Sequence, residues 1–97
     1  MAKRQSFRKN HGDQFKININ PEYQPLLDVM IFIDKYPRDE NNHISEMSGK
    51  EARSACHLIT PVFNEILDFL AVRGYLEYAC CDDLYNITLL GWPSMKR

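Results

Sequence analysis

The chain has 97 residues, 44% of them hydrophobic and 26% charged, with a formal net charge of −1. This length favours one domain with a single modest core. The sequence has no apolar run long enough to span a bilayer and no signal-peptide core near its basic start, so we expect no membrane association and a cytoplasmic or nucleoid-associated location.

The charges are unevenly distributed. Residues 1 to 20 carry five basic side chains and one acid, whereas residues 21 to 95 carry twelve acids and five basic side chains. We predict a flexible basic arm over residues 1 to 14, too polar to repay ordering, and an acidic domain over residues 15 to 97. In the arm, the candidate phosphate-contacting residues are Lys3, Arg4, Arg8 and Lys9. The alternative role of the arm is solubility alone.

The first predicted elements are a strand at residues 15 to 19, where apolar and polar residues alternate, and a helix between Asn20 and Tyr36. Two prolines leave the start of the helix uncertain by about a turn. The helix carries two apolar stripes: one is Leu26, Leu27, Met30 and Ile33, and the other is Val29, Phe32 and Tyr36. A helix that is apolar on two sides is often buried on two sides, so the second stripe is a candidate homodimer contact, and the strand at residues 15 to 19 is the other candidate. The alternative is a central helix wrapped by its own domain.

A short strand at residues 43 to 45 and a second helix are predicted next. Ser48 and Glu51 have the spacing of a capping box at the start of this helix. One face is predicted to pack close to a third helix through small residues, and it consists of Ala52, Ala55, Cys56 and Ile59. Another side carries the candidate phosphate contacts Lys50, Arg53 and His57.

The third predicted helix begins near Thr60, whose hydroxyl can cap it, and Pro61 suits its first turn. Apolar residues recur at helical spacing: Phe63, Ile66, Leu67 and Leu70. Arg73 favours the negative end of the helix, and Gly74 supplies a left-handed stop.

A hairpin follows directly. Residues 75 to 80 and 84 to 89 are rich in strand formers and flank the polar link at residues 81 to 83. Alternation along the first strand predicts that either Cys80 or Cys81 points into the core. The whole order predicts an α+β fold of the winged helix-turn-helix type, with three helices and a small antiparallel sheet.

The last forty residues also resemble a known family. The run Arg73-Gly74-Tyr75-Leu76, the short hairpin and the segment Ile87-Thr88-Leu89-Leu90-Gly91 are similar to the recognition helix and wing of MarR-type winged-helix repressors. The resemblance implies a winged helix that binds DNA. Two features depart from that family: the hairpin lacks its basic Asp-x-Arg wing, and no long dimerisation helices follow Gly91.

The sequence shows no catalytic motif. It lacks a Gly-rich phosphate loop, a metalloprotease helix motif and a Cys-x-x-Cys pair, and its three histidines fall in separate elements. We therefore expect no enzymatic activity, cofactor or metal. A metal or thiol site at the hairpin tip, residues 80 to 83, is the weaker alternative.

Two functions remain. In a small DNA-binding transcription regulator, the third helix would face the major groove of duplex DNA, with Asn64 and Arg73 contacting bases or phosphates. However, Glu65, Asp68, Asp82 and Asp83 place negative charge where phosphates would lie. The rival is therefore an acidic winged-helix module for protein interaction, an adaptor or inhibitor with a basic protein partner.

Overall fold

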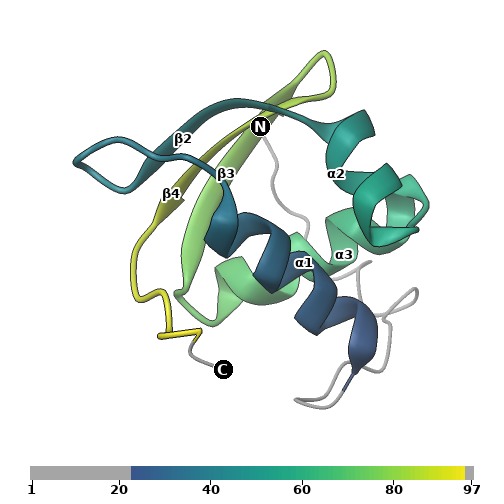
Figure 1. Cartoon of the computed structure of the whole chain (residues 1–97), viewed down its shortest axis with the longest axis horizontal. Helices are drawn as coiled ribbons and strands as arrows, with labels where there is room; N and C mark the ends of the chain where they lie inside the picture. The colour runs from purple at the N-terminus through teal and green to yellow at the C-terminus, as the bar shows by residue number, and fades with distance from the viewer. Residues whose placement is uncertain (1–22, 96–97) are drawn as a thin grey trace.

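Residues 23 to 95, which the computed structural model describes, form helices and strands in the predicted order (Figure 1). The predicted arm and the predicted strand at residues 15 to 19 lie outside them. The elements are α1 (Gln24–Lys35), β2 (His43–Ser48), α2 (Gly49–Cys56), α3 (Thr60–Val72), β3 (Leu76–Cys81) and β4 (Leu84–Leu89).

The three strands form one antiparallel sheet in the order β2-β4-β3. In the central strand β4, alternate side chains are buried against the helices, which lie to one side of the sheet in Figure 1. These side chains are Tyr85, Ile87 and Leu89. The α+β fold predicted from the sequence is therefore confirmed.

Helix α1 begins at Gln24, and Pro25 lies in its first turn, where a missing N–H costs no helical hydrogen bond. Its buried face is Leu26, Val29, Met30 and Ile33. Val29 is 0% exposed, so it belongs to the domain core and is not available for the predicted dimer contact. Phe32 and Tyr36 are half-buried, and their ring centroids lie 5.8 Å apart.

The strand β2 is longer than the predicted segment at residues 43 to 45 and runs directly into α2. Its pairing with β4 shifts register between Ile44 and Met47, where Glu46 has a φ of 53°. The irregularity allows Ile44 and Met47, three positions apart, both to point into the core. At the junction, the Ser48 hydroxyl accepts a hydrogen bond of 3.1 Å from the Glu51 N–H, which confirms the Ser48 half of the predicted capping box.

The predicted small face of α2 is only half correct. Ala52 and Cys56 are buried, but Ala55 is exposed and Ile59 is 67% exposed. The reason for Ile59 is that α2 ends at Cys56, so Ile59 lies beyond the helix. The Cys56 Sγ lies 3.6 Å from the backbone oxygen of Asp28, so this face meets α1, whereas the sequence had pointed to the third helix.

Helix α3 buries the predicted residues Phe63, Ile66, Leu67 and Leu70. Its N-cap is Ile59 and Thr60 is already helical, so the predicted capping role of the Thr60 hydroxyl is wrong. The helix ends at Val72, and Gly74, two residues later, has a φ of 82°, which confirms the predicted left-handed stop. The Gly74 and Tyr75 N–H groups donate to the carbonyls of Ala71 and Leu70, as in a Schellman motif, and this stop turns the chain into β3.

The hairpin turn contains two residues, whereas the sequence predicted three. Cys81 pairs with Leu84, and Asp82 and Asp83 form the turn with φ values of 54° and 61°. Left-handed backbone at both positions is the geometry of a type I′ turn. Both Cys80 and Cys81 are exposed, so the prediction that one of them points into the core is wrong. The two cysteines lie on β3, the edge strand of the sheet, in which only Leu76 is buried.

Candidate nucleic-acid interface

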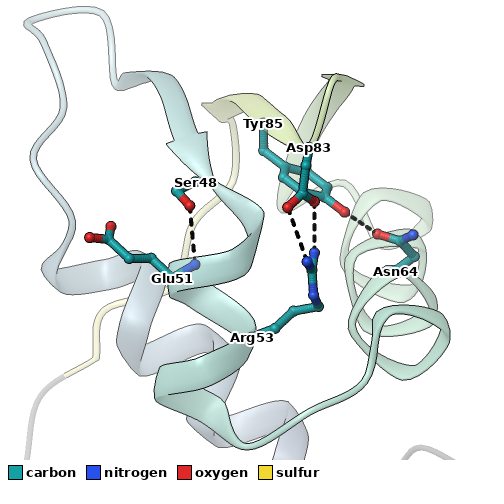
Figure 2. Close-up of polar contacts among 6 residues, drawn as sticks. All are labelled: Ser48, Glu51, Arg53, Asn64, Asp83 and Tyr85. Carbon is teal, nitrogen blue, oxygen red and sulfur yellow. Dashed lines mark hydrogen bonds and ion pairs between the residues drawn. The ribbon is translucent and has the colours of Figure 1, made fainter.

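Side chains from α2, α3 and the β3–β4 turn meet on one surface (Figure 2). Arg53 of α2 reaches across to Asp83 in the turn, and the Tyr85 hydroxyl of β4 donates to Asn64 Oδ1 of α3 at 2.5 Å. Two of these residues, Arg53 and Asn64, were predicted as DNA contacts. We call the set Arg53, Asn64, Asp83 and Tyr85 the polar row.

The ion pair of Arg53 and Asp83 is bidentate. Arg53 Nη1 and Nη2 donate to Asp83 Oδ1 and Oδ2 at 2.7 and 3.0 Å. The Asp83 carbonyl also accepts a 2.8 Å hydrogen bond from the Gly49 N–H. The hairpin tip is therefore bonded to α2 twice, through this backbone contact and through the Arg53 side chain. The hydrogen bond from Arg53 holds the pKa of Asp83 below its usual range, and the Lys50 N–H adds to this effect.

The lowered pKa of Asp83 predicts an acid-sensitive contribution to stability. Its folded pKa lies below the ordinary value of 3.8, so the stabilisation is present above pH 3.8 and disappears as the pH falls through the lowered value. Urea unfolding of the wild type and of Asp83→Asn should differ at pH 7, with the wild type more stable. The difference should close below pH 3.8. A difference that persists at pH 2 would contradict this assignment.

The α3 side of the polar row is fixed by aromatic residues. Tyr85 is 1% exposed, and its ring packs edge-on against Phe63 of α3 with centroids 5.4 Å apart. Burial raises the pKa of the Tyr85 hydroxyl, and the neighbouring Cys80 adds to the shift, so the hydroxyl stays protonated and can donate to Asn64. Asn64 Oδ1 is therefore engaged within the fold.

A second tyrosine, Tyr78 of β3, contacts an acidic side chain of α3. The Tyr78 hydroxyl of β3 donates to Asp68 Oδ1, and burial together with this carboxylate raises the pKa of Tyr78. Asp68 is exposed, as is Val72 one turn later, which is 87% exposed. The exposed residues on this side of α3 are thus a carboxylate held by Tyr78 and an apolar side chain, where a groove-reading helix usually presents donors.

The other predicted contacts differ in their surroundings. Lys50 is exposed next to the hairpin tip, and His57 is exposed in a left-handed conformation with a φ of 58° just after α2. Arg73 stacks over the Phe69 ring at 4.6 Å from its centroid, at the far end of α3. The structure therefore brings Arg53 and Asn64 to opposite ends of the polar row, places the backbone of the exposed Lys50 next to Asp83, and leaves Arg73 apart. The arm residues Lys3, Arg4, Arg8 and Lys9 lie outside the described part of the chain.

Sequence reasoning missed the two partners that organise the polar row, Asp83 and Tyr85. The buried alternation of β4 marks Tyr85 as a core residue, but its polar tip gives no sign of its acceptor. Asp83 had been noted only as a negative charge on the turn. Across residues 23 to 95 there are eleven acidic and five basic side chains, so Asp83 also neutralises one of few cations.

Other kinds of site find little support between residues 23 and 95. Within this range, no three His, Cys, Asp or Glu side chains are grouped to hold a metal ion. A shallow pocket of about 460 Å³ lies near the end of β4, where Trp92 Nε1 donates to Asp34 Oδ1 at 3.0 Å. No single helix in this range is long and apolar enough to cross a membrane; α2 and α3 satisfy that test only as a pair bent by 96°.

Comparison with known proteins gives no relative: no family model, curated protein or solved structure matches this chain.

Proposed function

We propose that this chain is a small winged-helix transcription regulator that binds duplex DNA. The observation that carries the proposal is the polar row, in which α2, α3 and the hairpin tip contribute to one surface. The element order and the strand order β2-β4-β3 support a winged helix, in which these three elements form the DNA-binding side. The MarR-like motifs around Gly74 and Gly91 agree with this arrangement.

The contacts on that surface favour phosphate binding over base reading. Lys50 is exposed on α2 beside Arg53, whereas Asn64 is engaged by Tyr85 and the outward side of α3 carries Asp68. In this proposal α2 supplies phosphate contacts, His57 adds one at the end of the helix, and the basic arm contributes salt-sensitive affinity. The proposal also gives Arg73, at the far end of α3, a contact with a phosphate.

Replacing Lys50 tests the proposal. Lys50→Gln removes one exposed cation from the α2 surface, so affinity for a random-sequence duplex should fall about three- to tenfold and the slope of log K against log salt should decrease by about 0.9. Lys35→Gln is the control, since Lys35 is an exposed lysine in the last turn of α1. Mobility shifts from low to near-physiological salt give both quantities. Equal effects of the two variants would contradict a specific role for the α2 surface.

A second candidate is supported by the charge of the domain. With eleven acids against five basic side chains, residues 23 to 95 suit a basic protein surface, and the exposed Asp68 and Val72 combine charge with apolar area. The chain would then be an adaptor or inhibitor. Absence of DNA binding at low salt would favour this function. Homodimer formation through Phe32 and Tyr36 is compatible with both functions.

A further inference from the structure

The Asp83 carboxylate holds Arg53 in the way a phosphate group would. An arginine fork makes the same two parallel hydrogen bonds to a carboxylate as to a phosphate, so one ligand excludes the other. In this structure both terminal nitrogens of Arg53 face the two Asp83 oxygens, at 2.7 and 3.0 Å (Figure 2). It is the one ion pair whose two partners both lie between residues 23 and 95, although many acids in this range are exposed. Arg53 is therefore paired with one particular carboxylate, although other acidic side chains are also exposed.

We infer that Asp83 is an autoinhibitory contact, a carboxylate on the hairpin tip that blocks Arg53 from binding the phosphate backbone of DNA. The inference rests on the proposed function, because DNA is the source of the phosphate. It explains why Arg53, a cation on the proposed DNA-binding surface, has a negative partner. It also means that the Asp83 side chain must release Arg53 when DNA binds.

The geometry allows the exchange. The Asp83 side chain is 44% exposed, so it can turn into water and leave the guanidinium, whereas the Arg53 side chain, which Asp83 partly covers, is 17% exposed. Lys50 lies exposed one turn earlier on α2, so a phosphate that replaces Asp83 at Arg53 has a second cation on the same helix. The Gly49 N–H bonds to the Asp83 backbone, so the side chain can be released while the tip stays attached.

The turn supplies a matched control. Asp82 and Asp83 are adjacent, exposed and left-handed, and replacing either by Asn removes one negative charge at a position where Asn is well tolerated. Only Asp83 pairs with Arg53 among the described residues. A difference between Asp83→Asn and Asp82→Asn therefore measures the contact with Arg53 and not the net charge of the tip.

The experiment compares the wild type and both variants in two titrations. With random-sequence duplex DNA at low salt, Asp83→Asn should bind about tenfold more tightly than Asp82→Asn, the size of one charge-assisted contact, and its salt slope should increase by about 0.9. With inorganic phosphate, followed by NMR of the Arg53 side chain, Asp83→Asn should shift at lower phosphate concentration than the wild type. Adding Arg53→Gln to Asp83→Asn should cancel both gains.

Equal gains in Asp82→Asn and Asp83→Asn, or gains that survive Arg53→Gln, would overturn the inference. If phosphate shifts Arg53 in Asp83→Asn while no variant binds DNA, the blocked anion site stands with free phosphate as its ligand, and the proposed DNA function fails. If Asp83→Asn does not fold, Asp83→Gly replaces it, because Asp-Gly is a favoured sequence for a type I′ turn.

Discussion

Phe63→Ala should remove about 3 to 5 kcal/mol from the free energy of unfolding, the largest loss expected from a single truncation in this domain. Phe63 is 0% exposed on α3, and its ring meets Tyr85 of β4 edge-on with an interplanar angle of 84°. Truncation would delete the apolar contact between helix and sheet and leave a cavity. The loss is a large part of the about 5 to 15 kcal/mol typical of a domain's stability. Urea unfolding followed by circular dichroism measures it.

The same helix offers a control at its surface. Val72 is 87% exposed, so Val72→Ala removes methyl groups from α3 without opening a cavity. Its effect should stay within about 0.5 kcal/mol. If Phe63→Ala costs as little as Val72→Ala, the packing of α3 against β4 is not what holds the domain together.

Local sequence rules predicted the features that depend on neighbours in the chain. The Ser48 cap needs an acceptor three residues before an N–H, and the stop at Gly74 needs a residue that adopts a positive φ. The buried face of α3, from Phe63 to Leu70, repeats at helical spacing. Each of these features is determined by positions a few residues apart, so the sequence displays it.

Features that depend on distant partners were not predictable in the same way. Arg53 and Asp83 are thirty positions apart, and Tyr85 and Asn64 twenty-one. Their pairing follows from the register of the hairpin and the close approach of its tip to α2, which no short pattern encodes. Sequence patterns therefore predict Arg53 and Asn64 as DNA contacts with no partner in the fold, whereas Arg53 bonds to Asp83 and Asn64 to Tyr85.

The errors in local detail also have tertiary causes. The two-residue turn moves Cys81 into β3, and both cysteines lie in the part of this edge strand that is exposed from Ala79 onward. The sequence places Val29 on the outer stripe of α1, but both α2 and α3 pack against that helix and Val29 is 0% exposed. Helical spacing predicts which residues share a face of the helix. How many of its faces are buried depends on how the other elements pack around it.

Gly49→Ala should destabilise the domain by about 1 to 3 kcal/mol, the usual cost of overpacking, although alanine favours a helix. A Cβ at Gly49 would lie against Asp83 Oδ1 and within 2.7 Å of Arg53 Nη1 and of Tyr85 Cε1. The two charged side chains have flexible ends that can move aside. The ring of Tyr85 is 1% exposed and packed against Phe63, so the hairpin itself must shift. Urea unfolding measures the loss.

The control is the same substitution at another glycine. At Gly91 an added Cβ would meet the Gly74 carbonyl oxygen at 3.3 Å, which a shift of a few tenths of an ångström relieves, so Gly91→Ala should cost less than Gly49→Ala. Adding Asp83→Gly to Gly49→Ala removes one of the three obstructing groups and should recover only part of the loss, because Tyr85 remains. Full recovery would assign the cost to the Asp83 carboxylate alone, and the fit of the hairpin against α2 would then not depend on the missing Cβ.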